Sequence, residues 1–241
     1  MVTTLLTLDR GNSTLDGMWH TEPPSRERVD PEDGDAVRRL LSANDPAAVA
    51  ALTVVESGLS RVEDILAERG CLVLVAGRDL ENPLRVAYDD PSGLGVDRWV
   101  GAFAARRLYG AAVVIDCGTA VTLSAVDADG VFLGGAIAPG AGTMAGSLAT
   151  ATPALPAVDL GADVSIPATS PQAAVDAGVQ LGFCGAVDRL VDDVVSATDL
   201  ANPVVVLTGG TASVYARHGR HPVRHHSDLL HLGLRWLIED A

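Results

Sequence analysis

The sequence contains no lysine, and all 17 of its basic side chains are arginine. This absence excludes a Schiff-base lysine and a lysine general base. It also excludes a Walker-type phosphate loop, whose Gly-Lys-Ser/Thr signature needs the ammonium group. Alanine, glycine, valine and arginine are abundant, which indicates coding bias as the origin of the absence. The chemical exclusions hold whatever its origin.

Positive charge and aromatic side chains are both scarce. Against 17 arginines stand 31 acidic residues, which gives a formal net charge of −14. Such an acidic surface repels phosphate backbones, so we expect no nucleic-acid partner. Aromatic residues make up 4% of a chain that is 48% hydrophobic. We therefore expect a sizeable core built mostly from valine, leucine and alanine.

Cysteines and long apolar runs are few as well. Cys71, Cys117 and Cys184 lie far apart without a Cys-x-x-Cys pair, which predicts buried free thiols in a reducing cytoplasm. No apolar run approaches the roughly 18 residues that span a bilayer, so we expect no membrane segment. The first residues reach Asp9 too early for a signal peptide. The sequence predicts a cytoplasmic protein of one large or two small domains.

Short β-branched runs alternate with longer amphipathic stretches, the pattern of an α/β protein. We expect strands at residues 3–8, 50–55, 71–77, 131–140 and 203–210, and a second set of strands beginning within 111–127. We expect helices at residues 35–43, 58–70, 98–109, 171–198 and 228–239. Ser60 is the expected cap of the second helix. The polar run 21–35 is predicted to form an exposed loop.

One pattern occurs twice, as LLTLDRGNST (5–14) and VVIDCGTAVT (113–122). In each copy an apolar strand leads to an aspartate, Asp9 or Asp116, then to a glycine and small polar residues. Glycine lets backbone N–H groups approach a phosphate, and the aspartate can hold a cation or its water shell. The half-chain spacing predicts a duplicated domain with a pair of phosphate-binding turns.

A third glycine element, LTGGTA (207–212), follows the strand PVVVL. One interpretation is a tight strand-to-helix turn. The other is that Gly209 and Gly210 clear space for a flat adenine or a sugar.

The segment YDDPSGLGVDRWVG (88–101) combines Tyr88, two turn glycines and the pair Asp97-Arg98. Asp97 could accept a proton from a substrate hydroxyl, and the planar fork of Arg98 could bind a carboxylate. The competing interpretation makes Asp97 a helix N-cap and leaves Arg98 solvated.

These motifs, in this order, resemble those of the type III pantothenate kinases, members of the actin-like superfamily of sugar and acetate kinases. LDRGNST is similar to the family's first phosphate motif, GVDR to its pantothenate motif, and IDCGTAVTLSAVDADGVFLGGAIAPG to its long second phosphate motif. SLATATPALPAV and LTGGTA resemble the segments that follow. The resemblance implies an α/β fold of two duplicated actin-like (ribonuclease H-like) domains, 1–110 and 111–241, with a cleft between them.

The resemblance also implies an activity and its residues. The reaction would phosphorylate pantothenate with ATP, giving 4′-phosphopantothenate, the first step of coenzyme A synthesis, in a homodimer. Asp97 would accept the proton of the pantothenate hydroxyl. Pantothenate would be held by Tyr88, Gly95, Val96, Asp97 and Arg98. ATP would be held by Asp9, Arg10, Gly11, Asn12, Ser13, Thr14, Leu15, Asp16 and Thr119. Asp9 would lie near Mg²⁺, and Asp116 would bind a monovalent cation, K⁺ or NH₄⁺.

The sequence departs from the family at several positions. Arg10 stands where an aliphatic residue is usual and adds positive charge beside the phosphate loop. Pro171 falls where the family has a pantothenate-binding threonine, and a short shift would bring Thr169 or Ser170 into its place. These departures leave open a non-catalytic regulatory paralogue on the same fold. A different small-molecule kinase is a further alternative, against which the Gly-x-Asp-Arg spacing argues.

Overall fold

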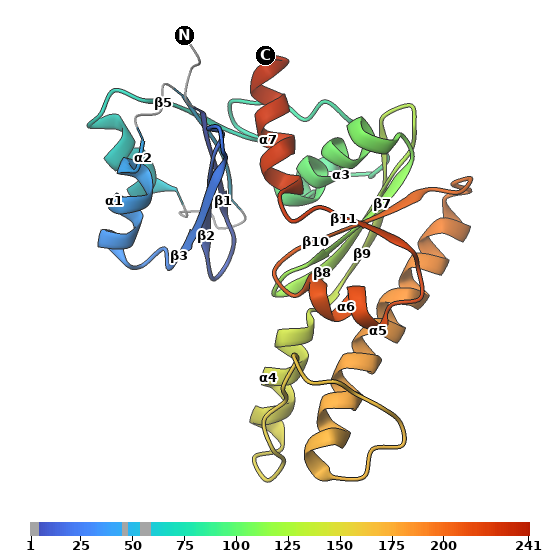
Figure 1. The fold of residues 1–241 in the computed structure, drawn as a ribbon. Coiled ribbons are helices and arrows are strands. Elements are labelled where there is room, and N and C mark those ends of the chain that lie inside the picture. Colours follow the sequence, from blue (N-terminus) through green and yellow to red (C-terminus); the bar gives the residue numbers. More distant parts are fainter. Residues whose placement is uncertain (1–4, 45–47, 54–58) are drawn as a thin grey trace. The chain divides into compact units, whose positions relative to one another are not determined.

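A computed structural model describes residues 5–44, 48–53 and 59–241 of the chain. It is a mixed α/β protein with one five-stranded and one six-stranded sheet (Figure 1). The chain packs as two compact units. Unit 1 comprises Met1–Arg85, Asp90–Ala104 and Asp228–Ala241, and unit 2 comprises Val86–Asp89 and Ala105–Ser227.

The sheet of unit 1 has the strand order β3-β2-β1-β4-β5. Its strands are β1 (Leu5–Arg10), β2 (Leu15–Trp19), β3 (Ser25–Val29), β4 (Ala48–Thr53) and β5 (Leu72–Val75). The first three form an antiparallel meander, and β1, β4 and β5 run parallel. The helices of this unit are α1 (Gly34–Ser42), α2 (Ser60–Ala67) and α7 (Leu229–Glu239), with the short 3-10 turn η1 (Pro91–Gly93) and the start of α3 (Val96–Tyr109).

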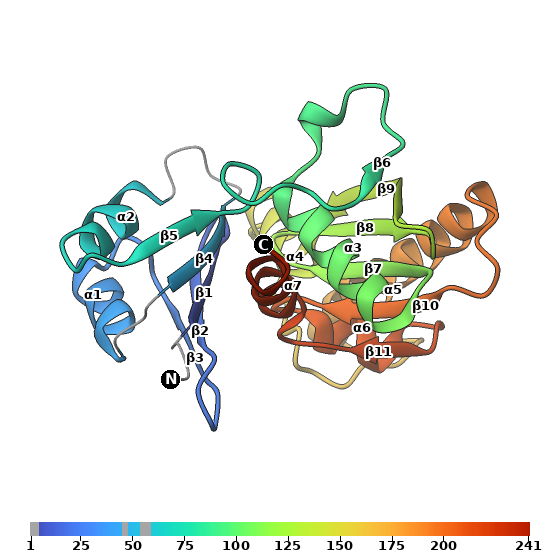
Figure 2. The same ribbon diagram turned by 90° about the horizontal axis from the view of Figure 1, so that it is seen from above.

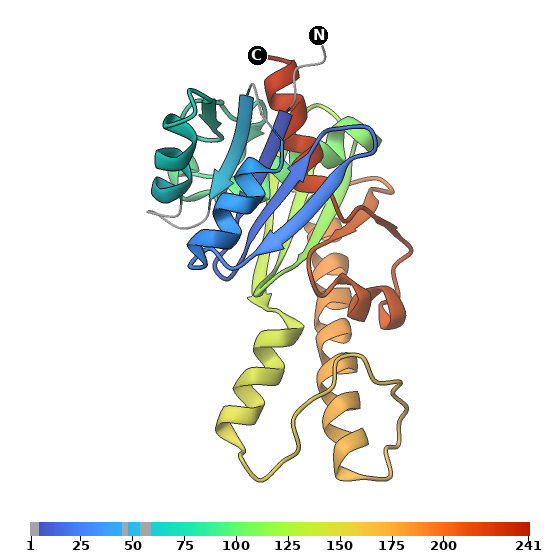
Figure 3. The ribbon, with the colours of Figure 1, turned by 60° about the vertical axis from the view of Figure 1, so that its left-hand side comes forward.

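The sheet of unit 2 has the order β11-β10-β7-β8-β9-β6. Its strands are β6 (Arg85–Val86), β7 (Ala112–Cys117), β8 (Ala120–Val126), β9 (Val131–Pro139), β10 (Val204–Thr208) and β11 (Val223–His225). Its helices are α4 (Ala141–Ala151), α5 (Pro171–Ala197) and α6 (Ala212–His218). Figure 3 shows α4, the segment that follows it and the first half of α5 extending beyond the edge of this sheet.

The two sheets repeat one topology. In unit 2, β7, β8 and β9 form the antiparallel meander, and β7, β10 and β11 run parallel, as β1, β4 and β5 do in unit 1. One helix follows the second strand of each parallel set, α2 after β4 and α6 after β10. The duplication predicted from the two aspartate motifs is confirmed by this matching order.

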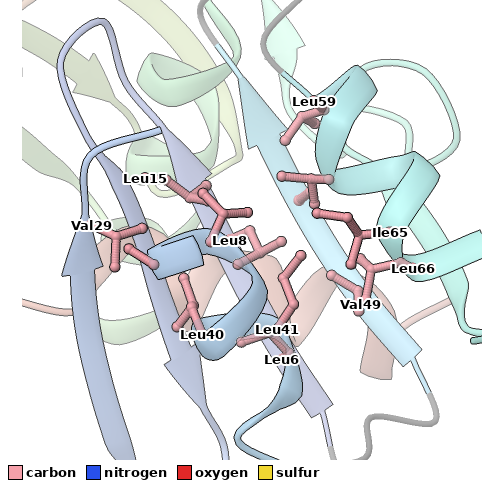
Figure 4. Close-up of a cluster of buried hydrophobic side chains, with 14 of the residues drawn as sticks. Leu6, Leu8, Leu15, Val29, Leu40, Leu41, Val49, Leu59, Ile65 and Leu66 are labelled. Carbon is pink, nitrogen blue, oxygen red and sulfur yellow. The ribbon is translucent and has the colours of Figure 1, made fainter. Parts of the chain in front are cut away.

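Side chains alternate across the sheet of unit 1, and its two faces differ in chemistry. Leu6, Leu8 and Leu15 point to the face covered by α1 and α2, where they pack with Leu40 and Leu66 in a hydrophobic core (Figure 4). Helix α7 covers the opposite face (Figure 2). The buried stripe of α1 consists of the four residues with helical spacing, Ala36, Val37, Leu40 and Leu41.

Several predicted elements need correction. The first strand runs through Asp9 to Arg10 instead of stopping before Asp9. The predicted loop 21–35 contains β3, since its residues Arg26 and Arg28 find a partner in the strand before them. Ser60 is the first residue of α2, and the N-cap position belongs to Leu59. Three predicted elements include residues that the structure does not describe. These are residues 3 and 4 of the strand 3–8, residues 54 and 55 of the strand 50–55, and residue 58 of the helix 58–70.

The predicted division into domains 1–110 and 111–241 stays a prediction. The units of the structure are bounded differently, since α7 belongs with residues 1–85. The physical reason is a buried contact, in which His231 of α7 binds Thr7 of β1.

Within the described part of the chain, no helix combines the length and the apolar character that a membrane crossing requires.

Candidate functional site

The first aspartate motif forms a β-hairpin, which we call the Asp9 hairpin (β1–β2). Asp9 and Asp16 are direct cross-strand partners, and Gly11–Thr14 connect the strands. The turn is closed by a hydrogen bond from the Gly11 N–H to the Thr14 carbonyl at 3.0 Å. Asn12, Ser13 and Thr14 are exposed. Asp9 therefore lies at the carboxyl end of β1, beside a polar turn, as the motif predicts.

Asp16 is the centre of a charged cluster on the sheet of unit 1. Arg26 donates to both carboxylate oxygens at 2.8 and 2.6 Å, and Arg28 donates to one of them. The Asp16 side chain is 4% exposed. Burial by itself raises the pKa of Asp16, but hydrogen bonds from His231, Arg26 and Arg28 hold that pKa well below its ordinary value. The predicted contact of Asp16 with ATP stays a prediction.

A chain of buried and partly buried hydrogen bonds continues from Asp16 to His20. The Nε2 atom of His231 lies 3.3 Å from Asp16, and its Nδ1 lies 2.9 Å from the Thr7 hydroxyl, which is also 2.9 Å from His20 Nε2. One proton order satisfies all three contacts: His20 donates to Thr7, Thr7 to His231, and His231 to Asp16. Burial lowers the pKa of His231 and, for His20, lowers it to about 4. Both rings are therefore neutral near pH 7.

The second aspartate motif forms the Asp116 hairpin (β7–β8). Its turn, Gly118–Thr119, is bound by the segment at the start of α4. The Thr143 hydroxyl donates to the Thr119 carbonyl at 2.6 Å, and the Gly140 N–H donates to the same carbonyl at 3.0 Å. A Cβ on Gly140 would stand 2.2 Å from the Gly118 carbonyl oxygen. Glycine is therefore required where the chain enters α4. Thr119 itself is exposed.

The third glycine element packs against the end of β7. Thr208 pairs with Asp116, and both the N–H and the hydroxyl of Thr211 donate to the Cys117 carbonyl, at 2.9 and 3.0 Å. Gly209 has φ +97°, and a Cβ there would lie 2.5 Å from an Asp116 carboxylate oxygen and 2.4 Å from the Cys117 nitrogen. This element is a tight turn, and its glycine leaves room for the Asp116 carboxylate. Burial raises the pKa of the Cys117 thiol to about 12, which makes it unreactive.

The GVDR segment opens α3. Asp97 is the second residue of the helix, so the N-cap interpretation is wrong. Its carboxylate accepts the Arg98 backbone N–H at 2.8 Å, and a Cβ on Gly95 would stand 2.7 Å from Asp97 Oδ1. Arg98 is 9% exposed rather than solvated. Burial raises the pKa of Asp97 above its ordinary value of 3.8, against opposing contributions from the Arg98 N–H and charge. A carboxylate with a raised pKa is a better proton acceptor.

The other predicted substrate residues lie in unit 2. Tyr88 stacks edge-on against the buried Phe132, with ring centroids 5.7 Å apart. The sequence did not indicate Phe132 as a neighbour of Tyr88, because only the folded chain brings the two rings together. Ser170 is the N-cap of α5 and accepts the Ala173 N–H at 3.2 Å, and Pro171 occupies the first helical position, where proline fits well. Thr169 and Ser170 are both exposed.

A polar stripe on α5 was also absent from the sequence prediction. Gln172, Asp176 and Gln180 follow one another at four-residue spacing and bind the backbone of residues 157–162. Gln180 is fully buried. The stripe pins the segment between α4 and α5 to the helix. The i, i+4, i+8 spacing is the signal that could have revealed it.

Comparison with known proteins gives a consistent result. A family model described as type III pantothenate kinase matches residues 5–193. A type III pantothenate kinase of Halorhodospira halophila is 32% identical over 255 residues, which covers 98% of both chains. A relative from Brevibacillus brevis is 32% identical, covering 88% of this chain and 89% of that protein. A relative from Rubrobacter xylanophilus is 39% identical over 150 residues, and there the match spans 57% of the relative's length.

Solved structures resemble the fold at low sequence identity. A protein described as a Baf family transcriptional activator from Campylobacter jejuni aligns with a TM-score of 0.66 at 19% identity, covering 98% of both chains. A ROK family glucokinase from Streptomyces griseus aligns with a TM-score of 0.56 at 13% identity, covering 99% of this chain and all of that one. These likenesses confirm the predicted actin-like fold.

Proposed function

The chain belongs to the type III pantothenate kinase family, and on this basis we propose that it transfers the γ-phosphoryl group of ATP to the primary hydroxyl of pantothenate. The single observation that carries the proposal within the chain is the start of α3. There a half-buried carboxylate with a raised pKa, Asp97, is followed by a buried arginine, Arg98. Such a pair suits an alcohol that must lose a proton and an acid substrate that carries a carboxylate.

Asp97 acts as the general base. An alcohol has a high pKa, so its proton moves to the carboxylate late, while the new O–P bond forms. Arg98 orients the substrate through the planar donor fork of its guanidinium. Tyr88, Gly95 and Val96 complete the pantothenate-binding set, with Thr169 and Ser170 as the hydroxyl donors that replace the family threonine.

The turn of the Asp9 hairpin and Thr119 of the Asp116 hairpin bind ATP. In the first hairpin this role extends over Asp9, Arg10, Gly11, Asn12, Ser13, Thr14, Leu15 and Asp16. When bound with ATP, Mg²⁺ would neutralise charge on the phosphates. A monovalent cation, K⁺ or NH₄⁺, would add to this effect.

The donors present fit such ions. Asp9 and Asp116 each offer one carboxylate at a strand end, and Mg²⁺ typically takes one or two carboxylates together with substrate phosphates and water. Among the described residues no three His, Cys, Asp or Glu side chains gather into a preformed cage. Asp9 is the residue proposed for Mg²⁺ and Asp116 the one proposed for the monovalent cation.

The working form is a homodimer in the cytoplasm. Support comes from exposed apolar side chains of unit 2, Ile137, Leu155 and Ile166, of which Ile166 is 71% exposed. Exposed apolar groups near a projecting helix pair are typical of subunit contacts. The three cysteines are free, as a reducing compartment allows.

The direct test is ADP release that depends on pantothenate. We expect Asp97→Asn to retain the fold and to lower kcat by about a hundredfold to ten-thousandfold, the usual contribution of a general base. Asp90→Asn is the matched control, since Asp90 is an exposed carboxylate that only caps η1. Activity near wild type in Asp97→Asn would overturn the assignment of the base. Wild-type protein that releases no ADP would point to the regulatory paralogue instead.

The cation is tested separately. Turnover should rise when K⁺ or NH₄⁺ replaces a large organic cation, and Asp116→Asn should lose that response. Turnover indifferent to both ions would remove the role proposed for Asp116.

A further inference from the structure

Arg10 carries a buried charge that the described part of the chain does not neutralise. The residue ends β1 and is 7% exposed. Its Nη1 donates to the adjacent Gly11 carbonyl, while its Nε is buried without a hydrogen-bond partner. Among the residues that the structure describes, no carboxylate forms an ion pair with it. Arg10 thus differs from Arg26 and Arg28, which both form ion pairs with Asp16.

A buried cation without a counter-charge lowers the stability of the free protein. An apolar side chain would fit better at this position, because Arg10 shares its face of β1 with Leu6 and Leu8 of the core. The guanidinium can be compensated by an anion that arrives from outside the chain.

The position of Arg10 indicates where that anion binds. β1 and β4 run parallel and end together at Arg10 and Thr53. In α/β sheets, ligands bind outside the carboxyl ends of parallel strands. The hydrogen bond to Gly11 holds the guanidinium beside the exposed turn of the Asp9 hairpin, and Asp9 points to the opposite face of the strand.

We propose that Arg10 is an anion receptor whose partner is a phosphate of the bound nucleotide. The guanidinium lacks a counter-charge until ATP or ADP binds, and its free donors then meet phosphate oxygens in a charge-assisted contact. Arg10 in this way supplies a positive charge at the first phosphate motif of a chain that has no lysine. The inference rests on the proposed kinase function.

The test compares Arg10→Met with wild type in two measurements on the full chain. Thermal unfolding without ligand should show a higher Tm for Arg10→Met, because the uncompensated charge is gone. Calorimetric titration with Mg·ADP should show affinity about tenfold to a hundredfold weaker, the range of a lost charge-assisted bond. Titration with pantothenate should be unchanged. A purely structural arginine would not combine a gain in stability with a loss of nucleotide affinity.

Arg38→Met is the matched control, because it changes the net charge equally on the exposed side of α1. It should alter neither Tm nor affinity. Arg10→Lys keeps the charge and should retain part of the Mg·ADP affinity.

Each other outcome contradicts the inference in a distinct way. A lower Tm or a failure to fold in Arg10→Met means that the chain itself compensates the charge. Mg·ADP affinity within twofold of wild type rules out the phosphate contact. A loss confined to pantothenate reassigns the guanidinium to the substrate carboxylate. Wild-type protein that binds no Mg·ADP overturns the proposed function together with this inference.

Discussion

The two aspartate hairpins share a strand pattern but differ in construction. The Asp9 hairpin is surrounded by charge: Asp16 binds Arg26 and Arg28, and His231 closes the cluster. The Asp116 hairpin is surrounded by close backbone contacts, with Gly140 and Gly209 packed against its turn and its strand end. The same hairpin pattern is therefore stabilised by two physical means, compensation of the buried Asp16 charge in unit 1 and steric fit around the turn in unit 2.

This contrast predicts which substitutions each hairpin tolerates. The Asp9 hairpin should be sensitive to loss of charge and tolerant of added methyl groups at its turn. The Asp116 hairpin should be tolerant of loss of charge and sensitive to methyl groups added next to its turn. Three predictions test this contrast, beginning with the largest expected effect.

Substitution Gly209→Ala should be the most destructive change to the Asp116 hairpin. The new Cβ would overlap the Cys117 backbone at 2.4 Å, and the residue has φ +97°. We expect a loss of about 2–5 kcal/mol in the free energy of unfolding, measured by denaturant titration. The matched change in the Asp9 hairpin, Gly11→Ala, has its nearest neighbours at 3.8 Å and should cost less than about 0.5 kcal/mol. Equal losses in the two variants would contradict the contrast.

Substitution Asp16→Asn should destabilise the Asp9 hairpin by removing its negative charge and one acceptor oxygen. The shape is kept, but two arginines and a buried histidine lose their anionic partner. Breaking a buried pair costs about 3–5 kcal/mol, and the partial exposure of Arg26 and Arg28 lowers our expectation to about 2–3 kcal/mol. Asp193→Asn, which removes an exposed partner of Arg189, is the control and should show no measurable change. High salt should narrow the gap between wild type and Asp16→Asn.

Acid should destabilise the folded chain through the two histidines next to the Asp9 hairpin, His20 and His231. The pKa of His20 is lowered from 6.5 to about 4 in the folded chain, so the unfolded state binds the proton more readily between these values. Stability should therefore fall as pH drops from about 6.5 to 4, and the lowered pKa of His231 acts in the same direction. Urea unfolding at a series of pH values measures the slope, which His20→Gln should flatten. A stability that rises on acidification would show that the sign is wrong.

Much of the fold could be predicted from local patterns. The stripe Ala36–Leu41 and the helix after Pro171 follow helical spacing and capping rules, and they appear where those rules put them. The loop predicted at 21–35 is wrong, because the charged residues Arg26 and Arg28 are typical of a loop until Asp16 of the neighbouring strand pairs with them. The pairing of β2 with β3, which makes this segment a strand, cannot be read from the order of residues. Short charged strands owe their stability to their neighbours rather than to their own propensity.

The candidate site likewise has features that the sequence predicts and features that only the structure shows. Asp9, Asp97 and Asp116 could be named from sequence, because each stands at a strand or helix end two residues from a glycine. The sequence alone could not show that Asp97 lies within the first turn of α3, half-buried beside a buried Arg98.

The absence of lysine illustrates what composition can establish and what depends on tertiary contacts. Because the composition contains no lysine, it leaves arginine, metal ions and backbone groups as the means of binding a phosphate, whatever the fold. Which arginines are available for this purpose depends on tertiary contacts that the composition does not reveal. Arg26 and Arg28 are tied to Asp16, whereas Arg10 is buried with an unsatisfied Nε. The physical reason is that the electrostatic role of a charge depends on its burial and its partners, and both arise from contacts between residues distant in sequence.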